Sequence, residues 1–592
     1  MNNMETMDVE NVAGNPYPNK KTQMTKLTTF IVLFLSILVM ALVTKVIVLQ
    51  INSTKFQHIL ANSNSLLDRN CPRNEENVDG QGPSLAPNFS VLAVEQLLSS
   101  LNESVDPCEF FYNYACQGWI SGQSFTSTAP DGKTVINLKG QLSMDSITGE
   151  RNTRLIRNFL DKMVYTPNRT GDGVENELKS FYESCIQLKK NSSIIHPVTG
   201  RLIKWMFLRQ ESFLSLQNVV VKLVTLGEDD PKHNSIPCTE LAKNLFPEVV
   251  GKLFVENHYL NDNLAFSVQQ LLLQIRDTYL SHLDVVYSPW VDFQSWLELR
   301  RRINSAKIMQ GYPTDIMDSI WVASVYANVT INKNVSHFIV NLVQLMDLRE
   351  MRKQTLGMVT MNYFDNIRDV AANYLPSWDM LFISAGYAQF PIYHESFPDV
   401  LKFGRLGFII AHEFGHALSA YIRTNDQSRG ELPFGASNAT YQKFIDKLNC
   451  IENEYNTYQI PFSFPQRNTT HALTWNGSLT LEENFADFIA LKISFSAFMK
   501  EHKRTHGSQV NHEIPGLARF SKEQLFFIAN AQHWCTAFSD EVLHYQTFKE
   551  WTDAHSINPI RVLGPFSNSE EFATAFNCPV GSKYNPQKKC TF

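Results

Sequence analysis

Apolar residues recur with a helical period along most of the chain beyond residue 101. Segments 175–188, 266–283 and 337–355 are examples whose patterns predict helices. Residues 380–385 instead form a short run of apolar, β-branched and aromatic side chains, which is typical of a strand. The pattern therefore predicts a mainly α-helical protein with a small β-sheet.

A long, largely apolar run covers residues 27–49. About 20 residues are enough to span a bilayer, so we expect a single N-terminal transmembrane signal anchor. Lys20, Lys21 and Lys26 precede the run and favour a cytoplasmic N-terminus. A cleaved signal peptide is the alternative, although the run is long for one and lacks an obvious small-residue cleavage site.

The segments on either side of this run are polar. Residues 1–26 are expected to be a cytoplasmic tail, and residues 50–100, rich in Asn, Ser, Pro and Gly, a stalk. All nine cysteines and all ten Asn-x-Ser/Thr sequons follow the run, which fits an oxidising and glycosylating compartment. The sequence predicts a single-pass type II protein of the plasma membrane with its larger part outside the cell.

Length and charge narrow the classes of function. With 592 residues, of which 44% are hydrophobic, the chain can build more than one domain. Its net charge of −6 and the lack of a basic-aromatic module argue against a nucleic-acid partner.

Two histidines lie one helical turn apart in the apolar segment 406–418. His412 and His416 would share one face of a helix, so both imidazoles can bind the same metal ion. Glu413 follows the first histidine, where its carboxylate can act as a general base on an attacking water. This spacing predicts a catalytic zinc site with one ion per chain, and a chance match is the alternative.

A catalytic zinc ion needs a third protein ligand. Glu483 and Asp487 lie four residues apart near the start of a predicted helix that runs from 481 towards about 498. Glu483 could bind the metal while Asp487 accepts a hydrogen bond from the outer nitrogen of a ligand histidine. An ordinary acidic patch at a helix N-terminus is the alternative.

Hydrolysis of a peptide bond also requires a group that stabilises a developing oxyanion. His555 could donate to it, with Asp553 nearby to orient the ring, and Arg561 could hold a substrate carbonyl or carboxylate. Taken alone, His555 could equally be structural or merely exposed.

Three large apolar residues are candidates for a substrate pocket. Phe408, Ile409 and Trp534 could receive the side chain that follows the cleaved bond. They could equally be simple core residues.

Together these stretches match one family. Residues 106–119, the run 483–487 and the tail 553–592 make the chain resemble neprilysin and the endothelin-converting enzymes, which are zinc metallopeptidases. The resemblance implies a zincin-type, thermolysin-like catalytic domain facing a second helical domain. It assigns zinc binding to His412, His416 and Glu483, catalysis to Glu413, Asp487 and His555, and substrate binding to Arg561.

The resemblance also implies four disulfides. They are Cys108–Cys578, Cys116–Cys535, Cys185–Cys238 and Cys450–Cys590. Cys71 in the predicted stalk is left over. It could join two chains as a covalent homodimer, or it could remain a free or capped thiol.

The chain departs from the family pattern in three places. A gapless match places Ala371 where the family carries an Asn that clamps the substrate backbone, although a short slip would restore Asn373. Ser419 stands where the family has an Asp behind the second zinc histidine. The segment between Cys185 and Cys238 is shorter than in the family by most of a domain. We therefore expect an N-terminal part of the ectodomain at 101–184, a reduced helical cap at 185–345 and the zinc catalytic domain at 346–592.

Two classes of function follow. The first is a membrane-bound zinc endopeptidase that cleaves extracellular peptides on the amino side of hydrophobic residues. The second is a peptide-binding or scaffolding ectodomain with impaired catalysis, motivated by Ala371, Ser419 and the reduced cap. An exopeptidase would need a group that reads a free terminus, and only Arg561 could do so.

Overall fold

The structure is a computed structural model. It describes residues 89–123, 126–128, 134–136, 141–165, 173–190, 236–260, 263–284, 289–423, 436–464, 469–506, 517–538 and 553–591. The predicted tail and anchor, Cys71 and the stalk up to residue 88 lie outside these ranges. Among the described helices, none combines the length and the hydrophobicity that a bilayer crossing requires.

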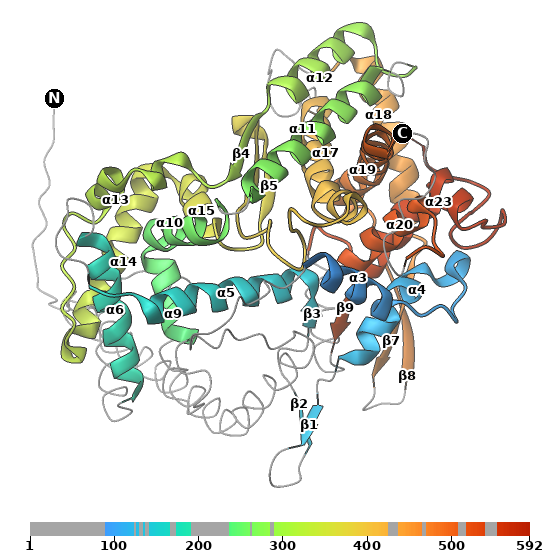
Figure 1. Ribbon diagram of the computed structural model, residues 1–592. Coiled ribbons are helices and arrows are strands. Elements are labelled where there is room, and N and C mark those ends of the chain that lie inside the picture. Colours follow the sequence, from blue (N-terminus) through green and yellow to red (C-terminus); the bar gives the residue numbers. More distant parts are fainter. Residues whose placement is uncertain are drawn as a thin grey trace, which may run out of the picture.

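The described chain is mainly helical with short strands, which confirms the fold class predicted from the pattern (Figure 1). The first helices are α3 (Phe89–Ser100), α4 (Pro107–Gly122), α5 (Met144–Lys162), α6 (Gly173–Lys190), α9 (Ile236–Leu245), α10 (Pro247–His258), α11 (Leu264–His282), α12 (Phe293–Ser305), α13 (Ser319–Val325), α14 (Phe338–Leu356) and α15 (Met358–Asn366). The predicted helices at 175–188, 266–283 and 337–355 correspond to α6, α11 and α14.

The C-terminal part of the chain supplies the other α-helices among the described residues. They are α16 (Asp399–Lys402), α17 (Phe408–Arg423), α18 (Asn438–Tyr455), α19 (Leu481–His506), α20 (Lys522–His533), α22 (Asn558–Ser567) and α23 (Glu570–Ala575). A π-helical turn, Phe403–Gly407, leads directly into α17. Its Arg405 is fully buried and donates to the Pro391 carbonyl at 2.7 Å, which fixes where α17 begins.

The main sheet has three strands in the order β4-β6-β5. Strand β6 (Met380–Ser384) is central and confirms the strand predicted at 380–385, with β4 (Lys307–Gly311) parallel to it and β5 (Ala372–Leu375) antiparallel. The smaller pairs are β1 (Thr126–Thr128) with β2 (Thr134–Ile136), β3 (Gln141–Ser143) with β9 (Thr536–Phe538), and β7 (Gln459–Phe464) with β8 (Thr469–Thr474). Strand β5 therefore forms one edge of the three-stranded sheet.

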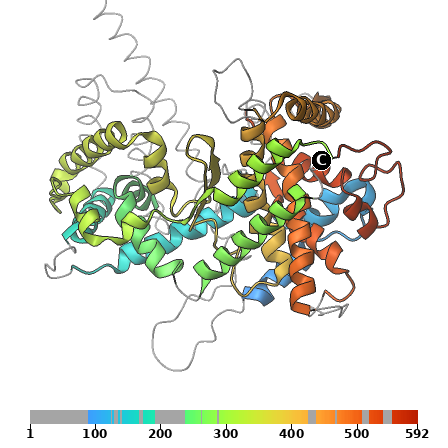
Figure 2. The same ribbon diagram turned by 90° about the horizontal axis from the view of Figure 1, so that it is seen from above.

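Helix α5 runs between two groups of helices (Figures 1 and 2). On one side lie α6, α9, α10, α13, α14 and α15, and on the other lie α3, α4, α17, α19 and α20. At its N-terminal end, α5 continues from β3, which pairs with β9 near the end of the chain. The domain limits expected at 184 and 345 fall inside α6 and α14, and they stay predictions.

Four disulfides tie distant parts of the chain together. They join the pairs that the family resemblance implied: Cys108–Cys578, Cys116–Cys535, Cys185–Cys238 and Cys450–Cys590. Two of them bind α4 to the C-terminal part of the chain, so the N-terminal helices are built into the same body as α20 and α23.

Candidate metal centre

Helices α17 and α19 pack closely at one glycine. A Cβ atom at Gly415 would lie 3.0 Å from Cα of Ala486, so a larger residue here would require the two helices to move slightly apart. Gly415 lies between His412 and His416, and Ala486 precedes Asp487. The close contact therefore brings the two histidines of α17 against the acidic residues of α19.

His412, His416 and Glu483 bring one ligand atom each to a single point. The Nε2 atoms of the two histidines are 3.1 Å apart, and Glu483 Oε2 lies 3.1 Å from the first and 3.3 Å from the second. Ligands about 2.0–2.1 Å from a tetrahedral zinc ion are separated by about 3.3 Å, so these residues fit zinc without rearrangement. The three form a group that could hold a metal ion.

Asp487 lies behind the ligands, where it holds both His412 and Arg561. Its Oδ1 is 2.8 Å from His412 Nδ1, and Arg561 donates to both of its oxygens at 2.7 Å. Burial would raise the pKa of Asp487, but the charge and hydrogen bonds of Arg561 hold it below its usual value. The carboxylate is therefore ionised and directs Nε2 of His412 towards Glu483.

Protons compete with a metal for His412. Burial would lower the pKa of this imidazole, but hydrogen bonds with Asp487 and Glu483 raise it to about 9. Because a metal ligand must be the neutral imidazole, metal binding here must displace a proton.

Glu413 lies beside the three ligands and is only 6% exposed. Burial raises its pKa, and the charges of His412 and His416 oppose that rise. A buried carboxylate with raised proton affinity suits a general base that must accept a proton from water.

His555 also reaches the ligand group. Its Nε2 is 3.2 Å from Glu483 Oε2, while Asp553 Oδ1 lies 2.9 Å from its Nδ1 and also accepts from its backbone N–H. The ring is 51% exposed, so it borders solvent on one side of the centre. Asp553, the neighbour expected from the sequence, and Glu483 both contact the ring.

A buried network that sequence reasoning missed holds the His555 loop against α19. Ser556 donates to Asn484 Oδ1 at 2.7 Å and accepts from Trp475 Nε1 at 2.9 Å. Asn484 follows Glu483, so its place inside the acidic motif was the available signal.

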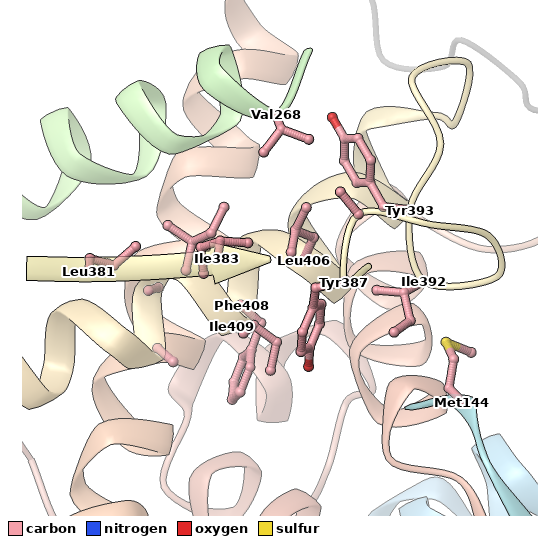
Figure 3. Packing of buried hydrophobic residues seen from close by; sticks show 14 of the residues in the cluster. Met144, Val268, Leu381, Ile383, Tyr387, Ile392, Tyr393, Leu406, Phe408 and Ile409 are labelled. Carbon is pink, nitrogen blue, oxygen red and sulfur yellow. The ribbon is translucent and has the colours of Figure 1, made fainter. Parts of the chain in front are cut away.

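The three candidate pocket residues lie together next to Arg561. The Arg561 guanidinium lies 3.9 Å from the centre of the Trp534 ring, and Phe408 meets that ring edge-on at 5.8 Å. Phe408, Ile409 and Trp534 are all buried. Figure 3 shows Phe408 and Ile409 side by side with Tyr387, a residue that sequence reasoning did not single out.

The structure shows the contacts of the residues at which the chain departs from the family pattern. Ser419 is buried and its hydroxyl donates to the His416 carbonyl at 3.3 Å rather than to the imidazole. Ala371 immediately precedes β5, where its N–H and carbonyl bond with Ser384. Asn373 lies in β5 opposite Phe382, and its buried side-chain oxygen accepts no hydrogen bond within the described chain.

A mainly helical fold in which one helix carries a His-Glu-x-x-His motif and a closely packed second helix supplies a glutamate as the third ligand defines the zincin class of metallopeptidases. Residues 371–592 match the sequence profile of Peptidase family M13. The resemblance to neprilysin and the endothelin-converting enzymes is thereby confirmed.

Individual proteins with these names are also similar to the chain in sequence. The chain is 30% identical to human "Endothelin-converting enzyme-like 1" over 62% of its own length and 44% of that protein. It is 26% identical to "Neprilysin-21" of Caenorhabditis elegans, over 60% and 44% respectively. The chain spans less than half the length of these curated relatives.

Solved structures share the fold at low identity. The "Haemonchus galactose containing glycoprotein complex" matches with a TM-score of 0.59 at 17% identity, covering 86% of this chain and all of that one. The Mycobacterium tuberculosis zinc metalloprotease ZMP1 in complex with an inhibitor matches with a TM-score of 0.56 at 13% identity, over 84% and 99%.

Proposed function

We propose that the protein is a zinc metalloendopeptidase that hydrolyses peptides. The observation that carries the proposal is the convergence of His412, His416 and Glu483 at tetrahedral ligand spacing beside the buried Glu413. Zinc held by these residues would supply a Lewis acid and lower the pKa of the attacking water.

The roles of the protein's own groups follow from their positions. Glu413 takes the proton from the attacking water and passes it to the leaving amine. His555, held by Asp553, donates to the oxygen on which negative charge develops. Arg561 fixes Asp487 through two hydrogen bonds, and Asp487 fixes His412. In this arrangement the main role of Arg561 is to orient Asp487.

The free edge of β5 offers a place for an extended peptide. In the antiparallel pair of β5 with β6, Ala371 and Ser384 are hydrogen-bonded, so the backbone groups of Ala372 and Tyr374 point to the other side. A substrate could add there as a further strand, held by main-chain hydrogen bonds. Such binding would need no side chain at Ala371.

Location and assembly are part of the proposal. The apolar run 27–49 and the sequons support a single-pass type II protein of the plasma membrane that acts on extracellular peptides. Phe408, Ile409 and Trp534 support cleavage before hydrophobic residues. Cys71 could link two chains as a covalent homodimer.

A peptide-binding ectodomain without turnover is the second candidate. It is favoured by Ser419, because among the described residues no carboxylate supports His416 in the way that Asp487 supports His412.

Glu413→Gln tests the catalytic proposal. The variant should retain zinc, because the three ligands are untouched, and lose about 100- to 10,000-fold in kcat. Metal content and cleavage of a mixed peptide library are measured with the purified full chain, with and without a chelator.

Glu256→Gln, an exposed site on α10, is the matched control and should cleave like the unaltered protein. Undiminished cleavage by Glu413→Gln would contradict the mechanism. Zinc-loaded, folded protein that binds peptides without cutting them would favour the binding ectodomain.

A further inference from the structure

A polar pair lies directly beside the candidate pocket. His533 ends α20 next to Trp534, and their rings meet edge-on at 4.8 Å. The Tyr387 hydroxyl is 3.4 Å from His533 Nε2. Figure 3 shows the Tyr387 ring between Ile409 and Met144. Polar groups therefore adjoin the buried cluster of Phe408, Ile409 and Trp534 on the side of Trp534.

Asp145 adds a carboxylate to this end. Its Oδ1 lies 3.9 Å from His533 Nε2, and that oxygen is buried without a hydrogen bond among the described residues. The side chain as a whole is still 46% exposed, so the other face of the carboxylate is open. Pairing of Ser143 in β3 with Thr536 in β9 brings Asp145 to His533.

The negative charge of Asp145 is balanced only in part, by Arg561. Burial lowers the pKa of His533 to about 3, so its imidazole is neutral. Within the described ranges, no lysine or arginine lies at ion-pair distance from Asp145. Burial raises the pKa of Asp145 to about 6, with Arg561 opposing, and the group is still ionised at neutral pH.

Asp145 is linked to Tyr387 through His533. The charges of both Asp145 and Glu413 raise the pKa of the buried Tyr387, whereas Arg561 lowers it; burial is the largest cause. Tyr387 and Asp145 meet at His533, whose Nε2 lies 3.4 Å from the Tyr387 hydroxyl and 3.9 Å from Asp145 Oδ1. A substrate side chain placed against Trp534 would lie next to His533 and its neighbour Asp145.

We propose that Asp145 binds the positive tip of a lysine or arginine side chain of the peptide, while the aliphatic stem packs along Phe408, Ile409 and Trp534. This inference rests on the proposed peptidase function and refines its substrate class. Long basic side chains combine an apolar stem with a charged tip, which matches an apolar surface that ends in an unpaired carboxylate. Cleavage is therefore expected before residues that combine an apolar stem with a positive tip, rather than before purely hydrophobic residues.

The test uses peptides blocked at both ends that differ at one position after the cleaved bond. Lysine is compared with norleucine, which has a similar stem without the charge, and mass spectrometry locates the cut. The unaltered full chain should favour lysine in kcat/KM by roughly tenfold or more, the range expected for a charged hydrogen bond. Asp145→Asn should bring the lysine-to-norleucine ratio close to one, and Asp145→Glu should keep it well above one.

Glu95→Gln removes the same charge from an exposed site on α3 and should leave the ratio unchanged. Thermal unfolding of each variant checks that it is folded. A ratio that is the same in the unaltered protein and Asp145→Asn would overturn the proposal.

Failure of the peptidase function is a separate outcome. If no peptide is cut in a chelator-sensitive manner, the dissociation constants of the same two peptides are measured by calorimetry. Tighter binding of the lysine peptide, lost in Asp145→Asn, would support the role of Asp145 in a binding ectodomain. Equal binding of both peptides would overturn it.

Discussion

Two aspartates orient two different histidines of the site. Asp487 is buried and contacts His412, whereas Asp553 is half-exposed and contacts His555. The first histidine belongs to the metal group and the second only borders it. Loss of the Asp487 carboxylate should therefore affect zinc affinity, whereas loss of the Asp553 carboxylate should affect kcat.

Asp487→Asn should weaken zinc binding by about 10- to 100-fold, the usual effect of losing a carboxylate behind a ligand histidine. The amide would also leave the buried Arg561 guanidinium without its charged partner. Competition with a chromophoric chelator measures the zinc affinity. Asp553→Asn should keep that affinity and lower kcat, and equal zinc affinity in all three proteins would contradict the role of Asp487.

Residues that share one helix could be assigned from sequence, whereas residues that meet through tertiary pairing could not. His412 and His416 follow from helical spacing alone, and Glu483 with Asp487 from a second helix. The join between the two helices depends on Gly415 facing Ala486, which no local pattern reveals. Asp145 could not be predicted from the sequence, because it reaches His533 only through the pairing of β3 with β9.

Helix positions were predicted better than helix ends. Helix α19 extends to His506, beyond the end expected near 498, because residues 499–506 contain no Gly or Pro and keep helical propensity after the apolar pattern stops. Glu501 supports this polar turn through its ion pair with Arg504.

Asp292 couples two helices through their N-terminal ends. It caps α12 by accepting from the backbone N–H groups of Gln294 and Ser295, and it also accepts from the hydroxyls of Ser437 and Thr440 at the start of α18. Burial would raise the pKa of Asp292, but the hydrogen bonds from Ser437, Thr440 and Ser295 lower it well below its usual value.

Asp292→Ala should therefore destabilise the protein by about 0.5–2 kcal/mol near pH 7, the range for loss of a helix cap. Because the folded-state pKa is lowered, the stabilisation is present above the unfolded-state pKa of about 4 and declines as the pH falls below it. Denaturant unfolding at several pH values measures the difference in unfolding free energy between the unaltered protein and Asp292→Ala. A difference that grows below pH 4 would contradict this account. The control is Asp277→Ala, on the exposed side of α11.

At the scale of the whole molecule, the N-terminal helices help to build the centre formed by the C-terminal ones. Helix α4 is bonded to the turn after α20 through Cys116–Cys535, and Tyr112 on α4 donates to the Trp534 carbonyl at 3.2 Å and accepts from Thr536 N–H. Trp534 in turn lies under Arg561. Family resemblance implied the disulfide pairs, but only the three-dimensional arrangement connects one of them to the candidate pocket.

Removing Cys116–Cys535 should thus affect substrate binding as well as stability. We expect the Cys116→Ser, Cys535→Ser double variant to lose about 2–5 kcal/mol of unfolding free energy, as is usual for a native disulfide. KM for peptides should rise, because Trp534 loses one of its two anchors to α4. The matched control is Cys450→Ser, Cys590→Ser, which opens a disulfide between α18 and the C-terminal tail. It should lower the melting temperature while leaving KM unchanged, so equal KM values in both double variants would show that α4 does not position the pocket.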